Sequence, residues 1–129
     1  MIAEKELTVL LNAELQSIAK MFSAIDECEW PKLSEYFHDD VVYIRPGYDP
    51  IHGLAELLDF YAHRRIIAKG KHIIEETCVG SNGTLISATG SFTGVDRSGK
   101  AVQVRFCDVY VFQTGKIRRR ETFFNSPAV

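Results

Sequence analysis

The chain has 129 residues, 46% of them hydrophobic and 25% charged, with 15 basic and 17 acidic side chains and a net charge of −2. This size and composition are typical of a single globular domain, here residues 1–129. The near-neutral charge argues against nucleic acid or an anionic membrane as a partner. No apolar run reaches the ~20 residues that span a bilayer, and Met1 to Leu11 carries no signal-like apolar core, so we expect a cytoplasmic protein.

Cysteine and histidine spacing gives no sign of a metal centre or a disulfide framework. Cys28, Cys78 and Cys107 are odd in number, far apart and without a partner at metal-ligand spacing. The chain also lacks a Walker loop and a dinucleotide-binding fingerprint. We therefore expect neither a metal nor a cofactor.

The amino-terminal half reads as three helices and one strand. Apolar residues at three- and four-residue spacing predict a first helix that fades near Cys28. Pro31 suits the first turn of a short second helix, which Asp39-Asp40 ends before a strand from Val41 to Arg45. After a loop at 46–50, a third helix follows Gly53 and stops at Gly70. The apolar face of the first helix consists of Leu7, Leu11, Leu15, Ile18, Phe22 and Ile25.

From Lys71 onward the pattern changes to two-residue alternation, which is typical of strands. Turn signals at Ser81-Asn82-Gly83, at residues 96–99 and at Thr114-Gly115 divide this region into a meander that ends with a strand from Lys116 to Phe124. Helices first and a meander afterwards predict an α+β fold, with three amino-terminal helices packed on one face of an antiparallel sheet.

Asp108 breaks the pattern of the longest predicted strand. It is in phase with an apolar set that should face inward: Val104, Phe106, Tyr110 and Phe112. A buried carboxylate must be paired, hydrogen-bonded or protonated. Two interpretations follow: a structural carboxylate that caps backbone groups or an arginine, or a pocket acid with a perturbed pKa.

Three stretches resemble one known family: residues 37–46, Ile51-His52-Gly53 with Asp59-Phe60-Tyr61-Ala62, and residues 108–124. They are similar to the ketosteroid isomerase and SnoaL-like cyclase branch of the superfamily that resembles nuclear transport factor two. The resemblance implies a cone-shaped, cystatin-like α+β barrel, in which a strongly curved sheet wraps around a hydrophobic pocket. The resemblance covers nearly the whole chain, but its motifs are mostly turn and core residues. It therefore predicts the fold better than it predicts the reaction.

The catalytic residues of that branch are only partly present. By the resemblance, Asp108 falls where ketosteroid isomerases keep a protonated aspartic acid. Phe22 stands at the position of their tyrosine, and Arg45 at that of their general base, which an arginine cannot replace. Thr122 stands where limonene-epoxide hydrolases place an aspartate. The chain is therefore not a ketosteroid isomerase by the known mechanism, and it fits the SnoaL-like group best.

Two functions remain open. One is an enzyme that isomerises, cyclises or dehydrates a small, mostly apolar carbonyl or hydroxyl compound, with Asp108 as acid–base group and Arg45 as anchor. The other is a non-catalytic module that binds a ligand or dimerises. The expected ligand-binding wall is Phe22, Tyr43, Phe60, Phe106, Tyr110, Thr122 and Phe124.

Three expectations about neighbours follow from this interpretation. Arg45 and Asp108 should contact each other or share a ligand in one pocket. Arg120 fits a solvated rim better than a second cation in the pocket. A homodimer is expected through the outer face of the sheet, where Val109 and Val111 point outward with Cys107 and Arg105.

Overall fold

The computed structural model describes residues 4–81 and 83–126. A long helix, α1 (Glu4–Asp26), is followed by a short 3-10 helix (Trp30–Glu35), and α2 (Leu54–Asp59) continues into a π-helical turn (Phe60–Arg64). Six strands complete the fold: β1 (Phe37–Ile44), β2 (Ile51–His52), β3 (Ile67–Val79), β4 (Leu85–Asp96), β5 (Ala101–Gln113) and β6 (Lys116–Phe124). No described helix is long and apolar enough to cross a membrane.

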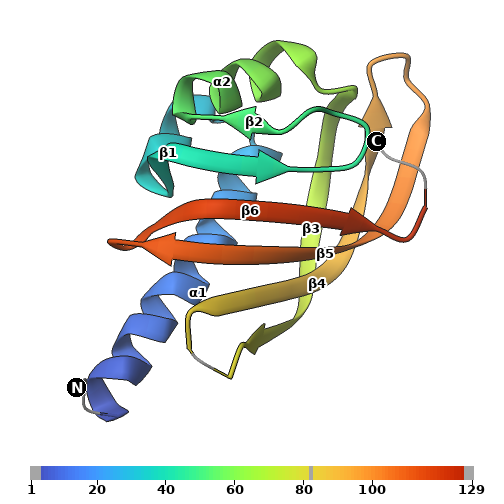
Figure 1. Cartoon of the computed structure of the whole chain (residues 1–129). Coiled ribbons are helices and arrows are strands. Elements are labelled where there is room, and N and C mark those ends of the chain that lie inside the picture. The colour runs from blue at the N-terminus through green and yellow to red at the C-terminus, as the bar shows by residue number, and fades with distance from the viewer. Residues whose placement is uncertain (1–3, 82, 127–129) are drawn as a thin grey trace.

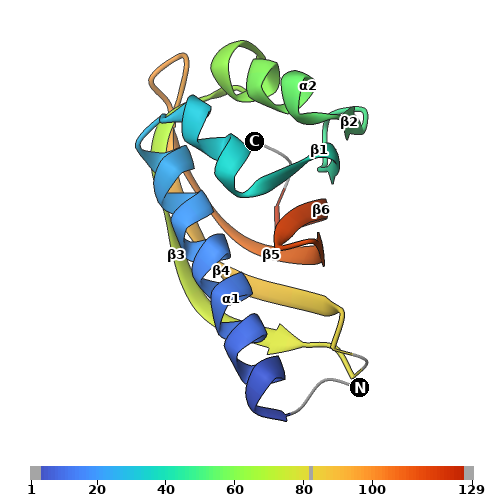
Figure 2. The same cartoon turned by 90° about the vertical axis from the view of Figure 1, so that its left-hand side faces the viewer.

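The strands form one curved, unclosed sheet in the order β2-β1-β6-β5-β4-β3. All neighbours are antiparallel except β1 and β6, which run parallel. The helices lie on the inner face, with α1 along β3 and α2 over β1 and β2 (Figures 1 and 2). The α+β class and the strongly curved sheet are confirmed, while two α-helices and two short helical turns stand where three helices were expected.

The core fills the space between the inner sheet face and the helices. On α1, burial is confined to the carboxyl-terminal half, from Ile18 to Ile25. The side chain of Leu7 lies outside the described part of the chain. On β4 and β5 every second residue points inward, as the alternation predicts. These inward residues are Ile86, Ala88, Gly90 and Phe92 on β4, and Val104, Phe106, Asp108 and Tyr110 on β5.

Two predicted boundaries are wrong, and both errors involve β-structure. The strand expected at Val41 begins at Phe37, because the pairing with β6 shifts register between Phe37 and Val42 and leaves Asp39-Asp40 exposed inside the strand. The third helix ends at Arg64 rather than Gly70, since Arg65 takes extended backbone (φ −68°, ψ 147°).

Gly70 is instead a strand residue whose missing side chain makes room for β4. A Cβ there would lie 2.2 Å from the ring of Phe92 and 2.7 Å from the carbonyl oxygen of Thr93. The glycine therefore permits close approach of two strands and does not end a helix. The predicted hairpin does join β3 to β4, with Gly83 at φ 74°, while Asn82 lies outside the described residues.

Candidate active site

Four inward side chains on β5 and β6 form a compact polar square. In the antiparallel register Asp108 lies opposite Thr122, and Tyr110 lies opposite Arg120. Side chains that are directly opposite or diagonal on one sheet face are close enough to bond. Because the pairing shifts between Val111 and Phe112, β6 buries both Ile117 and Arg120, although they are an odd number of residues apart.

Asp108 is fully buried and accepts hydrogen bonds from all three neighbours in this square. Its Oδ2 atom lies 2.9 Å from Nη2 and 3.0 Å from Nε of Arg120, and it accepts a 2.6 Å bond from the Tyr110 hydroxyl. Its Oδ1 atom accepts a 2.5 Å bond from Thr122. The carboxylate is therefore paired and saturated, as the structural interpretation requires.

Arg120 is the arginine that pairs with Asp108. Only 3% of it is exposed, so the expectation of a solvated rim position is wrong. Burial is the largest single influence and lowers the pKa of Arg120, but Asp108 together with the hydroxyl groups of Tyr43, Tyr61 and Tyr110 outweighs it and holds that pKa well above its ordinary value. Arg120 also donates a 2.8 Å bond from Nη1 to the Tyr61 hydroxyl, and its guanidinium carbon lies 4.5 Å from the centre of the Tyr43 ring.

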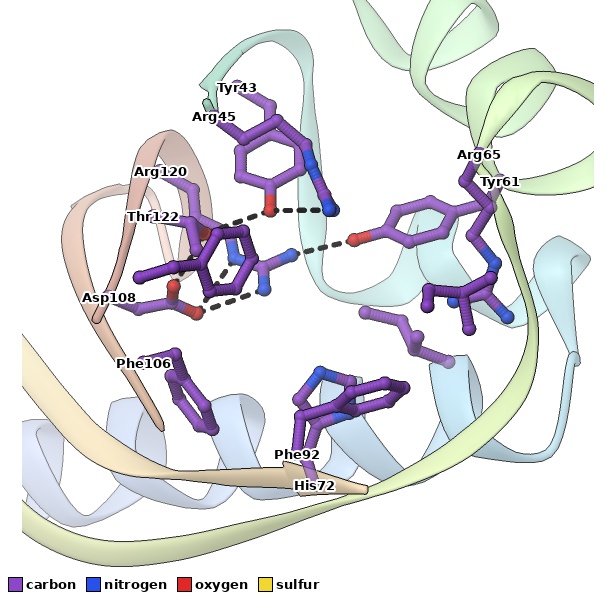
Figure 3. Close-up of a pocket in the computed structure, with 13 residues that line it drawn as sticks. Tyr43, Arg45, Tyr61, Arg65, His72, Phe92, Phe106, Asp108, Arg120 and Thr122 are labelled. Atoms are coloured by element: carbon purple, nitrogen blue, oxygen red, sulfur yellow. Dashed lines mark hydrogen bonds and ion pairs between the residues drawn. The ribbon is translucent and has the colours of Figure 1, made fainter. Parts of the chain in front are cut away.

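Arg45 reaches Asp108 through two hydroxyl groups. Its Nη1 atom donates to the Tyr43 hydroxyl at 3.4 Å, and that hydroxyl lies 2.8 Å from Oγ1 of Thr122. Since Thr122 gives its only hydrogen to Asp108, Tyr43 must be the donor to Thr122. The hydrogen bonds therefore all run in one direction, toward the carboxylate (Figure 3).

These groups line one wall of a cavity of about 30 Å³, which is large enough for a water-sized guest. Arg45 and Asp108 thus face one space, as expected. Among the predicted wall residues, the cavity is lined by Tyr43, Phe106, Thr122 and Phe124. Phe22, Phe60 and Tyr110 are also buried, but they pack behind the lining side chains.

His72 is the lining residue that sequence reasoning missed. Its backbone N–H donates to Oδ2 of Asp26 at 2.9 Å, and its Nδ1 atom lies 2.6 Å from Oδ1 of the same carboxylate. The imidazole stacks on Phe22 with ring centres 4.5 Å apart, and it lies 4.7 Å from the ring centre of Phe92. Figure 3 shows the ring at the floor of the cavity, below the polar square.

The environment of His72 favours the neutral imidazole. Burial among aromatic rings, aided by the positive charge of Arg120, lowers its pKa despite the opposing hydrogen bond and charge of Asp26. A carboxylate can only accept, so Nδ1 carries the hydrogen and Nε2 keeps its lone pair. No described group forms a hydrogen bond with Nε2. A histidine whose one nitrogen is oriented by a carboxylate while the other is available can accept a proton.

The sequence held only a weak signal for this pair. Alternation along β3 puts His72 in phase with Gly70 and Ile74, on the inner face. Asp26 lies 46 residues earlier, at the end of α1, so no local spacing connects the two. Arg65, which also lines the cavity, falls inside the third helix that was predicted to run to Gly70, so the sequence did not place it at the cavity.

A family model of the SnoaL-like domain matches residues 18–120. No protein of curated function is similar enough in sequence to match the chain.

Several solved structures share the fold. An NTF2-like protein from Burkholderia pseudomallei superposes with a TM-score of 0.78 at 20% identity, covering 88% of this chain and 91% of its own. TerC, co-crystallized with polyporic acid, gives 0.77 at 17% identity, covering 88% and 92%. An epoxide hydrolase from M. tuberculosis, similar to limonene-epoxide hydrolases, gives 0.74 at 16% identity, covering 88% and 79%.

Proposed function

The chain belongs to the SnoaL-like domain family, and we propose that it is an enzyme that moves a proton on a small, mostly apolar carbonyl or hydroxyl compound. The observation that carries this proposal is the His72–Asp26 pair at the floor of the cavity. The reaction would be an isomerisation, an aldol-type cyclisation or a dehydration, and it needs no bound cofactor.

In this proposal Nε2 of His72 is the general base. A neutral imidazole with a pKa below its ordinary value is ready to accept a proton at neutral pH. Asp26 holds the ring in the tautomer that presents the lone pair and stabilises the imidazolium that forms. A carbon next to a carbonyl group, placed above the ring, would lose its proton to Nε2, and its electron pair would move to the carbonyl oxygen.

The same pair connects the cavity with the surface. His72 and Asp26 also line a surface groove between α1 and β3, beside Ser23 and Lys71. Nδ1 would keep its hydrogen on Asp26, so the proton taken up at Nε2 would leave from Nε2 itself, either to another atom of the substrate or to a water in the cavity. Either transfer restores the neutral base.

Arg120 of the polar square, together with Tyr61, to which it is hydrogen-bonded, would stabilise the negative charge that develops on the substrate oxygen. Arg120 is fixed by Asp108, and burial raises the pKa of Tyr61, so its hydroxyl stays protonated. Preorganised donors of this kind stabilise an enolate more than the neutral substrate. Asp108 thus serves as a positioning residue that holds Arg120 and Thr122, in place of the acid–base role expected from the sequence.

Deuterium exchange tests this proposal without knowledge of the natural substrate. Small ketones and 1,3-dicarbonyl compounds are incubated with the protein in D₂O, and loss of the proton next to the carbonyl is followed by NMR. We expect exchange above the buffer rate, reduced on the order of 10²-fold or more by His72→Gln. His63→Gln is the matched control, since His63 also pairs with an aspartate but is largely exposed. Exchange that survives His72→Gln would contradict the proposal.

The small cavity volume favours a second candidate, a non-catalytic module. A space of about 30 Å³ holds little beyond a water-sized guest unless side chains move, and Asp108 is already saturated. If this candidate is correct, a compound that binds the protein will undergo no exchange above the buffer rate.

A further inference from the structure

Arg65 is a buried cation at the edge of the cavity that has no anionic partner in the described chain. Only 5% of it is exposed, and it follows the π-helical turn where the chain enters β3. Its guanidinium carbon lies 5.0 Å from the ring centre of Trp30 and 5.5 Å from that of Tyr61. Within residues 4–81 and 83–126, its guanidinium group has neither a hydrogen-bond acceptor nor a carboxylate within 4.0 Å.

The charges around Arg65 leave it uncompensated. Burial lowers the pKa of Arg65, as do the nearby cations Arg45 and Arg97, while Tyr61 and Cys28 raise it without reversing the shift. The cavity is lined by three arginines and a single carboxylate, Asp108, which is already committed to Arg120. A buried charge is costly unless it is paired, and stacking on aromatic rings offsets only part of that cost.

Figure 3 shows where this unmatched charge lies relative to the other groups. Arg65 is on one wall, and the Asp108–Arg120 pair is on the wall across the cavity, with His72 on the floor between them. A guest that reaches Arg65 would therefore extend past the imidazole toward Arg120. A guanidinium group offers paired N–H donors that match the two oxygens of a carboxylate.

We propose that the ligand of this cavity is a carboxylate, whose negative charge is bound by Arg65. This inference rests on the proposed function only for the position of the reacting carbon, which would lie between the carboxylate and Arg120, above His72. The binding preference itself follows from the buried, uncompensated guanidinium. The substrate class would then be a small carboxylic acid that also carries a carbonyl or hydroxyl group.

The test compares carboxylates with their uncharged amides at constant ionic strength. Acetate, benzoate and phenylacetate are titrated against acetamide, benzamide and phenylacetamide, and binding is followed by calorimetry and by the NMR resonances of the arginine Nε–H groups. We expect at least one carboxylate to bind at least tenfold more tightly than its amide and to shift the Arg65 resonance. Equal affinity for acid and amide would overturn the proposal, and this comparison requires only the wild-type protein.

Variants then locate the site. Arg65→Gln should weaken carboxylate binding at least tenfold, whereas the adjacent Arg64→Gln should leave it unchanged. Arg64 is the matched control because its side chain is 44% exposed and pairs with Asp59 at 3.2 Å, away from the cavity wall. Equal losses in the two variants, or no loss in Arg65→Gln, would contradict the assignment.

A third variant separates this inference from the proposed function. His72→Gln should retain carboxylate binding while losing deuterium exchange. If carboxylates bind but wild-type protein shows no exchange, the ligand class stands and the catalytic proposal fails. If exchange occurs on uncharged ketones and no carboxylate binds, the catalytic proposal stands and the carboxylate ligand class is wrong.

Discussion

The Nη2 atom of Arg120 lies 2.9 Å from Oδ2 of Asp108, and both side chains are buried between the sheet and the helices. The two residues are diagonal neighbours on adjacent antiparallel strands. Each offsets the cost of burying the other, and the hydroxyl groups of Tyr110 and Thr122 complete the set of bonds to the carboxylate. Removing one member of such a pair leaves an uncompensated charge in the core.

Arg120→Ala should therefore lower the free energy of unfolding by about 3–5 kcal/mol, as expected when a buried pair loses one partner. Arg119→Ala is the control, because the neighbouring arginine pairs with Glu121 at the surface, where such contacts contribute about 0–1 kcal/mol. Urea unfolding of both variants measures the difference. Similar losses in the two variants would show that Arg120 is not buried with Asp108.

Thr122→Val should lower the free energy of unfolding by about 1–3 kcal/mol, because it removes a buried donor to Asp108 and the acceptor of the Tyr43 hydroxyl. Valine has nearly the same shape, so the loss reports the hydrogen bonds rather than a cavity. Thr89→Val, on the outer face of β4, should change stability by less than about 0.5 kcal/mol. A neutral Thr122→Val would show that the relay from Arg45 to Asp108 contributes nothing to stability.

The stability of the protein should rise with pH near the ordinary pKa of histidine because of His72. Burial lowers its pKa from 6.5, so the unfolded chain binds a proton at a pH where the folded protein does not. The stabilising contribution of neutral His72 is then complete above about pH 6.5. As the pH falls below 6.5, the free energy of unfolding decreases by at most ~1.4 kcal/mol per pH unit. Asp26, Asp108 and Arg120 are the charged groups that act on the ring.

Chemical denaturation between pH 5 and 8 measures this slope. His72→Phe should flatten it, whereas His63→Gln should leave it unchanged, since His63 is exposed. A direct NMR titration should place the pKa of the His72 ring below its ordinary value of 6.5. A His72 ring that titrates above 6.5 would contradict this prediction and weaken the case for a neutral base.

We also expect a homodimer formed through the outer face of the sheet. Val109 and Val111 are only half-buried there, and the same face exposes Ile73, Leu85 and Phe123. An apolar area of this kind is typical of an interface. Light scattering at micromolar concentration should give a dimer that Val109→Arg converts to a monomer. Leu10→Glu, on the exposed half of α1, should leave the dimer intact. A wild-type protein that light scattering shows to be a monomer would contradict this prediction.

The sequence by itself determined the class of fold and the orientation of the long strands. Two-residue alternation placed Asp108 on the inner face of β5, and helical spacing marked the buried face of α1, because both periodicities depend only on local geometry. The last strand was predicted with its observed limits, Lys116–Phe124. Resemblance to the SnoaL-like group then predicted the curvature and brought Arg45 and Asp108 to one cavity.

Only the tertiary structure decided which partners these residues have. Arg120 rather than Arg45 pairs with Asp108, because strand register sets diagonal neighbours and no local pattern encodes register across β1, β5 and β6. The His72–Asp26 pair joins β3 to the end of α1, and Arg65 enters the cavity because the chain leaves the π-helical turn there. Charges that are separated by tens of residues become partners only when the packing of helices on the sheet excludes water between them, and that packing is a property of the whole chain.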